Sequence, residues 1–257
     1  MVAAVALVAG GAPLTAFQLG LSMVSLQFAI GALNDIVDAP ADAGRVPPKP
    51  IPSGAVGVPL ARVVVAISAG VGLVLAAMVG IQVVVLAVVV LVVGTVYDLV
   101  AKGTPWSWLP FAMGIPLLPV YGWVGARGSL PGFFGALVPM AVLAGAALAV
   151  ANARVDMEMD RAAGTRSVAT ALGANRSWWA GAALFTAATL IGVWLTRGTT
   201  WAWPAAALVI IGTGLVGAGV ALGRGGGPAA RRRAWEAQAI GAAIAAAGWV
   251  AGMLPGP

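Results

Sequence analysis

A series of long apolar runs constrains this chain more than any other feature. Eight such runs lie near residues 14–37, 58–79, 80–100, 106–124, 131–153, 176–196, 201–222 and 235–254. Each approaches the roughly 20 residues with which an α-helix crosses the hydrocarbon core of a bilayer. Only 9% of the residues are charged, whereas soluble domains have about 25%. We therefore expect a polytopic membrane protein.

A ninth apolar run, residues 1–12, is shorter than the others. Twelve helical residues span only about 18 Å, so this run predicts a short or tilted first helix. Counting it, we expect an all-α bundle of about nine transmembrane helices. We expect residues 1–257 to form a single transmembrane domain.

The charged residues are distributed unequally among the predicted loops. If residues 38–57 are cytoplasmic, alternation of the spans leaves only Arg127 and Arg197, of 14 Lys and Arg residues, on the outer side. An excess of Lys and Arg in cytoplasmic loops orients membrane proteins. The net charge of +6 therefore indicates membrane topology rather than a nucleic-acid partner. We expect a multi-pass protein of the cell membrane with its active site on the cytoplasmic side, where all eight acidic residues also fall.

The first group of acids ends the run 14–37, in the stretch NDIVDAPADAGR. It brings three aspartates in eight residues, and a proline that is expected to end the helix follows the second of them. Residues four apart share a helix face, so Asn34 and Asp38 should lie together, with Asp35 beside them. The polar residues of this first motif are Asn34, Asp35, Asp38, Asp42 and Arg45.

The second group of acids follows the run 131–153. Asn152, Asp156 and Asp160 are spaced four residues apart, which predicts that they share one face of a continuous helix. Arg154 and Glu158 are also four apart, on another face, and can pair with each other.

Acidic clusters of this kind need a cation. Two like charges 4 Å apart repel by about 4 kcal/mol at an effective dielectric constant near 20. Mg²⁺ prefers oxygen ligands and commonly keeps waters and substrate phosphates in its shell. The chain contains no His and no Cys, so other common metal ligands are excluded. The two clusters therefore predict a site for two or more Mg²⁺ ions that hold a diphosphate. The alternative interpretation is that they are simply solvated helix ends.

Basic residues lie on the loops beside both clusters and could neutralise phosphate oxygens. They are Arg45, Lys49, Lys102 and Arg166. Their alternative role is to orient the protein in the membrane. The stretch VYDLVAKG (96–103) places Tyr97 and Asp98 at another helix end, shortly before Lys102. The stretch GRGGGPAARRR (223–233) is interpreted as a flexible basic loop that serves as an orientation signal.

These motifs resemble those of the UbiA superfamily of intramembrane prenyltransferases. The pattern N-D-x-x-D-x-x-x-D with a trailing Arg (34–45) resembles its first aspartate motif. The pattern D-x-x-x-D (156–160), followed by GTRSVATALG, resembles its second. Tyr97 and Lys102 resemble its Tyr–Lys element, with a spacing one residue longer than usual.

The resemblance implies a bundle around a central cavity and Mg²⁺-dependent ionisation of an isoprenyl diphosphate. The metal ligands that it implies are Asp35, Asp38, Asp42, Asp156 and Asp160. The catalytic residues that it implies are Asp35, Asp38, Asp156, Asp160, Tyr97 and Lys102. The residues expected to hold the metal–diphosphate are Asn34, Asp42, Arg45, Lys49, Asn152 and Arg166.

The sequence leaves the fate of the prenyl group open. The helical segments are almost entirely apolar and offer few groups that could orient an acceptor. Transfer to an unidentified acceptor is the first interpretation, and internal quenching, as in a UbiA-type terpene cyclase, is the alternative. A transporter or lipid-binding protein is a third possibility, but it would place its acids near the bilayer midplane, whereas these acids end helices.

Overall fold

The computed structural model describes residues 1–44, 47–196 and 201–253. Its described residues are helical, with short turns and no strand, which confirms the all-α prediction. The chain divides into two compact units. The first unit combines residues 1–100 with 117–130, and the second combines residues 101–116 with those from 131 onward.

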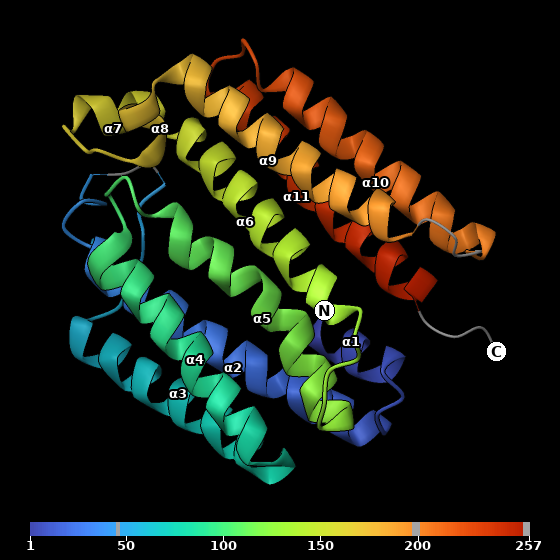
Figure 1. Cartoon of the computed structure of the whole chain (residues 1–257). Helices are drawn as coiled ribbons and strands as arrows, with labels where there is room; N and C mark the ends of the chain where they lie inside the picture. The colour runs from blue at the N-terminus through green and yellow to red at the C-terminus, as the bar shows by residue number, and fades with distance from the viewer. Residues whose placement is uncertain (45–46, 197–200, 254–257) are drawn as a thin grey trace. The chain divides into compact units, whose positions relative to one another are not determined.

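Each of the eight long apolar runs forms a helix (Figure 1). The elements are α1 (Val2–Val8), α2 (Pro13–Asp38), α3 (Val58–Val79), α4 (Ile81–Val96), the π-helical turn η1 (Tyr97–Ala101), α5 (Trp108–Arg127), α6 (Phe134–Val155), α7 (Met157–Ala162), α8 (Val168–Leu172), α9 (Ala174–Leu195), α10 (Trp203–Leu222) and α11 (Pro228–Met253). Among the described residues, seven helices are long and apolar enough to cross a membrane. The helix α11, which carries an arginine run near its start, is not among those seven.

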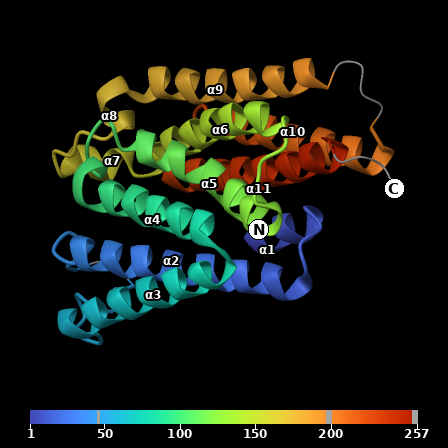
Figure 2. The same cartoon turned by 60° about the horizontal axis from the view of Figure 1, so that its bottom comes forward.

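The first unit is built on α2, which packs along α3 and contacts α1 and α4 (Figure 2). Its core contains Leu19 and Leu26 of α2 and Ala87 of α4, all fully buried. Ser22 Oγ donates a 2.7 Å hydrogen bond to the carbonyl of Gly72, and Tyr121 Oη lies 2.6 Å from Ser22 Oγ. Because lipid offers no hydrogen-bond partners, such groups must be satisfied within the protein.

The short first helix also belongs to this unit. It covers seven residues, buries Val2 and Ala6, and packs on α2. Gly10 then adopts a φ of 80°, in the left-handed region that glycine enters at little cost. The guanidinium of Arg127 donates to the carbonyl of Ala9. These two features fix the turn between α1 and α2.

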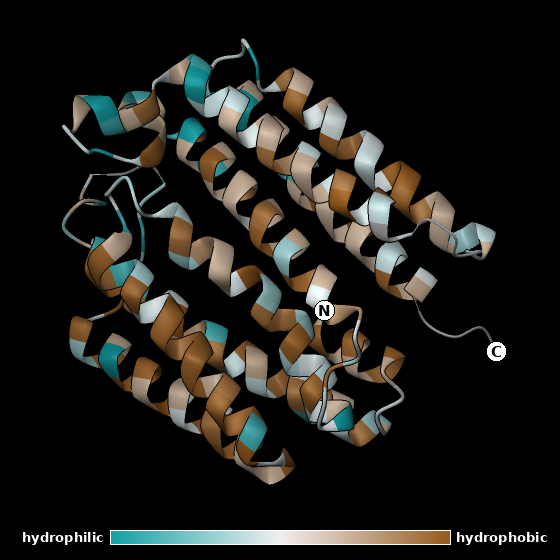
Figure 3. Ribbon diagram, in the orientation of Figure 1, coloured by the Kyte–Doolittle hydropathy of each residue, from teal (hydrophilic) through white to brown (hydrophobic). Residues whose placement is uncertain are grey.

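The second unit packs α6 against α9 and α11, and α10 along α11. The α10–α11 contact depends on glycine: a Cβ at Gly241 would lie 2.6 Å from the carbonyl oxygen of Gly212. Small residues let helix backbones approach closely in lipid, where van der Waals packing is a main source of association. Within this unit, hydrophilic residues gather on α7 and at the adjacent end of α9 (Figure 3). The second acidic motif lies at this end of the unit, where α6 ends and α7 begins.

Candidate active site

The first acidic motif lies at the C-terminal end of α2. The helix ends at Asp38, as expected from the proline that follows. The chain then makes another turn, in which the backbone N–H of Asp42 donates a 2.9 Å hydrogen bond to the carbonyl of Asp38. This turn places the buried side chain of Asp42 beside those on the end of α2. Arg45, a predicted member of this motif, lies outside the described residues.

Lys49 binds all three carboxylates of the motif. Its Nζ lies 2.7 Å from Asp42 Oδ2, 3.2 Å from Asp35 Oδ1 and 3.9 Å from Asp38 Oδ2. The hydrogen bond with Asp42 raises the pKa of the Lys49 ammonium, although partial burial opposes this effect. The three carboxylates thus converge on the Lys49 ammonium. The sequence placed Lys49 near the motif, but it did not indicate this shared contact.

The amide of Asn34 binds a residue that was not assigned to the site. Its Nδ2 donates a 2.8 Å hydrogen bond to Oδ1 of Asp98, which is 4% exposed. Asn34 therefore connects the end of α2 to η1. The signal that could have identified Asp98 is its acidic side chain at the end of a run of valine and leucine, one residue after Tyr97.

The segment between Tyr97 and Lys102 contains the π-helical turn η1. A π-helix bonds residues five apart, and such turns often occur at functional sites. A π-helical turn holds one residue more than an α-helical turn. This additional residue accounts for the spacing between Tyr97 and Lys102, which is one residue longer than in the usual Tyr–Lys element. Tyr97 belongs to the first unit and Lys102 to the second, where Lys102 is half-buried.

The second acidic motif lies at a break between two helices, and the prediction of a continuous helix face is wrong. The helix α6 ends at Val155, and Asp156 has φ −96° and ψ 9° before α7 begins at Met157. The N–H of Asp160 still donates a 2.8 Å hydrogen bond to the carbonyl of Asp156. Asn152 therefore lies on α6, Asp156 at the break, and Asp160 on α7.

Arg154 and Glu158 do not form an ion pair with each other, contrary to the pairing that their spacing suggested. Arg154 is 6% exposed and donates to Ser177 Oγ at 3.0 Å and to the carbonyl of Gly223 at 2.8 Å. Glu158 instead binds Arg231, and this hydrogen bond lowers the pKa of the Glu158 carboxyl. The stretch 223–233 is not a loop throughout, because α11 begins at Pro228. Arg166 is exposed between α7 and α8.

The donors present suit Mg²⁺ better than a softer metal, because they are carboxylate and amide oxygens. Among the described residues, no group of three or more acids forms a ready metal cage by itself. Mg²⁺ commonly uses one or two carboxylates together with waters and substrate phosphates. The residues of each motif therefore fit a Mg²⁺–diphosphate rather than a metal enclosed by protein.

The second unit also contains an apolar cavity of about 470 Å³ between α6, α9, α10 and α11. Met140, Phe185 and Trp249 are among the residues that line it. None of the candidate site residues lines this cavity, so it is not the place where the acidic motifs act.

Comparison with known proteins identifies the fold. Residues 1–239 match the model of the UbiA prenyltransferase family. No curated protein matches the chain significantly.

Several solved structures share the fold. The apo structure of a UbiA homolog from Aeropyrum pernix K1 is 22% identical with a TM-score of 0.75, covering 95% of this chain and 93% of that one. A digeranylgeranylglyceryl phosphate synthase is 18% identical with a TM-score of 0.75, and the match covers 98% of this chain and 92% of that one. A UbiA homolog from Archaeoglobus fulgidus, bound to GPP and Mg²⁺, is 15% identical with a TM-score of 0.71, covering 95% and 94%.

Proposed function

The chain belongs to the UbiA prenyltransferase family, and we propose that it ionises an isoprenyl diphosphate with Mg²⁺ and transfers the prenyl group to an acceptor. The observation that carries this proposal is the position of Lys49 Nζ, within 2.7–3.9 Å of three carboxylates of the first motif. This position gathers three carboxylates at and just after the end of α2, where one or two of them can join waters and diphosphate oxygens around Mg²⁺.

Asp35, Asp38 and Asp42 would hold metal in the first motif, and Asp156 and Asp160 would do so in the second. Bound Mg²⁺ would supply Lewis-acid stabilisation of the negative charge that develops on the leaving diphosphate. Lys49, Lys102, Arg45 and Arg166 would donate to phosphate oxygens. Tyr97 would act with the first motif and Asn152 with the second.

In the reaction the allylic carbon–oxygen bond breaks, and its electron pair leaves with the diphosphate. The allylic cation that results then bonds to a nucleophilic acceptor, which loses a proton. A dry, apolar surrounding protects such a cation from water. We expect the long apolar helices whose ends carry the motifs to provide this surrounding. In a terpene cyclase the same ionisation would be followed by bond formation within the prenyl chain.

The proposal is tested by incubating the purified protein with prenyl diphosphates from C10 to C20 and longer. Mass analysis of the organic extract identifies the product, and EDTA followed by Mg²⁺ tests metal dependence. An extract of the native membrane supplies candidate acceptors, and a prenylated product formed only in its presence would indicate transfer. A cyclic hydrocarbon or alcohol formed without an acceptor would indicate the cyclase instead. If no diphosphate is consumed under any condition, the chain is not an enzyme of this type, and the transporter or lipid-binding interpretation takes its place.

We also propose that the acidic motifs face the cytoplasm, on the strength of the charge distribution. The chain contains no Cys, so single cysteines can be introduced without removing any. Ser53→Cys, next to the first motif, should react with an impermeant maleimide only from the cytoplasmic side. Ser129→Cys, in the loop after α5, should react only from outside. Both positions are exposed, and the reverse labelling pattern would contradict the orientation.

A further inference from the structure

Three consecutive arginines near the start of α11 differ sharply in their surroundings. The side chain of Arg231 is 11% exposed, whereas that of Arg232 is 73% exposed. Arg232 pairs with Glu236 one turn further along the same helix, at 3.6 Å. A run that only oriented the protein in the membrane would need charge from each arginine but no defined contact. The low exposure of the Arg231 side chain therefore calls for a separate explanation.

Arg231 binds both sides of the helix break at Asp156. Its Nη1 donates a 2.8 Å hydrogen bond to the carbonyl of Arg154, in the last turn of α6. Its Nη2 binds the carboxylate of Glu158, in the first turn of α7. Its Nε donates a 3.0 Å hydrogen bond to the carbonyl of Gly226, five residues earlier in the chain. This bond helps to fix the orientation of the guanidinium.

The interrupted helix explains why these contacts matter. In a continuous α-helix the carbonyl of residue 154 would accept a hydrogen bond from the N–H of residue 158. The backbone leaves helical geometry between them, at Asp156. Carbonyls at helix ends need partners from outside the helix, and Arg231 provides one. The same guanidinium also holds the side chain of Glu158, so it bridges the gap from α6 to α7.

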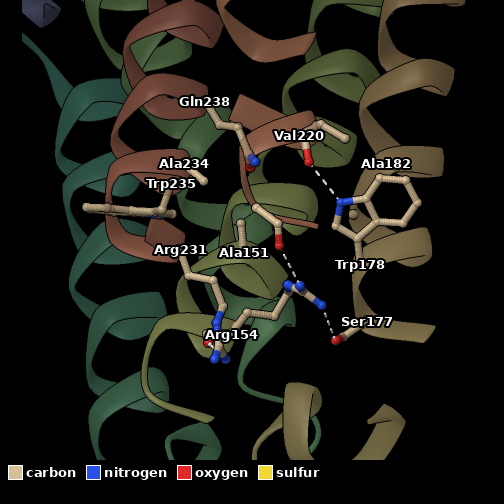
Figure 4. Close-up of a pocket in the computed structure, with 12 residues that line it drawn as sticks. Ala151, Arg154, Ser177, Trp178, Ala182, Val220, Arg231, Ala234, Trp235 and Gln238 are labelled. Carbon is tan, nitrogen blue, oxygen red and sulfur yellow. Dashed lines mark hydrogen bonds between the residues drawn. The ribbon is translucent and has the colours of Figure 1, made fainter. Parts of the chain in front are cut away.

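Arg154 anchors this bridge to the rest of the second unit. Its guanidinium donates to the carbonyls of Ala174, at the start of α9, and of Gly223, just after α10. The close-up in Figure 4 shows the side chains of Arg154 and Arg231 side by side at one end of a small cavity, with Ser177 on the α9 side. The backbone of residue 154 is thus fixed by its own side chain and by Arg231.

We infer that Arg231 is a positioning residue, which, anchored through Arg154, sets the geometry of Asp156 and Asp160. The inference rests on the proposed function, because it assigns Arg231 to the support of the second acidic motif. Asp156 is the residue at the break, and Asp160 lies on the short helix that the bridge holds. Outer residues that orient metal ligands typically change metal affinity by about 10–100-fold when mutated.

The test compares Arg231→Gln with Arg232→Gln in the full-length protein in detergent. Both changes remove one positive charge from the same run, so they have the same effect on orientation. Hydrogen exchange of amides 157–163 reports the rigidity of α7 without any ligand. Binding of Mn²⁺ with inorganic pyrophosphate, followed by electron paramagnetic resonance, reports the metal site independently of turnover.

We expect Arg231→Gln to accelerate exchange in residues 157–163 and to weaken Mn²⁺–pyrophosphate binding about tenfold or more. Arg232→Gln should change neither. Arg231→Lys should recover part of the affinity, because an ammonium can still reach one of the two acceptors. Glu158→Gln, which keeps the contact with the Arg154 carbonyl, should have a smaller effect than Arg231→Gln.

Two results would overturn the inference in different ways. Normal Mn²⁺–pyrophosphate affinity in a folded Arg231→Gln protein would show that Arg231 does not position the acids. Equal losses in Arg231→Gln and Arg232→Gln would show that only total charge matters. If the unchanged protein does not bind Mn²⁺ with pyrophosphate, the proposed function itself fails, and the inference fails with it.

Discussion

The side-chain amide of Asn34 donates a 2.8 Å hydrogen bond to Oδ1 of Asp98, and this contact joins the end of α2 to the π-helical turn η1. Asp98 is buried, and a buried polar group that loses its partner costs about 1–3 kcal/mol. The contact therefore connects the first acidic motif to the segment that carries Tyr97.

Asp98→Leu should lower the stability of the protein, because it removes the acceptor for the Asn34 amide. We expect a loss of about 1–3 kcal/mol, measured by chemical unfolding in detergent. Asp98→Asn keeps an oxygen acceptor in the same place and should be clearly less destabilising. Equal stability of the unchanged protein and Asp98→Leu would show that the contact does not support the fold.

Each of the four central aspartates should be required for turnover. Replacement of Asp35, Asp38, Asp156 or Asp160 by Asn keeps the shape but removes the charge that attracts metal. Loss of a single electrostatic group at a reacting centre commonly reduces turnover by about 100-fold or more. Glu236→Gln provides the control, because Glu236 is an exposed acid paired with Arg232. Full activity in two of the four Asn variants would contradict the metal-site model.

Lys49→Gln should affect metal and diphosphate in opposite directions. In the present structure Lys49 forms ion pairs with the three carboxylates that are proposed to bind metal. Without it, the mutual repulsion of those carboxylates is larger, and Mn²⁺ alone should bind more tightly. Pyrophosphate should bind more weakly, because one phosphate donor is lost. Separate titrations with Mn²⁺ and with pyrophosphate measure the two changes in affinity. Weaker Mn²⁺ binding by Lys49→Gln would contradict the competition between Lys49 and metal.

Gly241→Ala should destabilise the second unit without altering the chemistry of the site. Its new Cβ would lie 2.6 Å from the Gly212 carbonyl, which must then move. Overpacking typically costs about 1–3 kcal/mol. Gly217 has open space at its Cβ, so Gly217→Ala on the same helix pair is the matched control. A thermal midpoint that falls equally in both variants would show that the close approach is unimportant.

Much of the fold could be predicted from the sequence, because transmembrane helices depend mainly on the length and polarity of each run. All eight long runs form helices, and the first motif ends its helix before Pro40 as expected. The break at Asp156 could not be predicted, because spacing alone gives no reason to interrupt a helix there. Its partner Arg231 comes from a stretch more than 70 residues later, and only tertiary structure brings the two together.

The contacts between the site residues were harder to predict than the identity of those residues. Lys49 was expected near the first motif, but a loop residue can point in many directions, and its contact with three carboxylates depends on the turn that follows α2. The assignments of metal and substrate roles remain predictions. The sequence shows Asp98 at a helix end but indicates no role for it, because a single acid offers no spacing pattern.

The most direct test of the central claim, ionisation of an allylic diphosphate, uses a substrate with fluorine on the allylic double bond. Fluorine withdraws electrons and raises the energy of the allylic cation, while changing the size of the molecule little. We predict that turnover falls by about 100-fold or more, as expected for a large increase in activation free energy, while binding of the diphosphate changes little. Turnover of the fluorinated substrate at the normal rate would contradict the claim that ionisation limits the reaction.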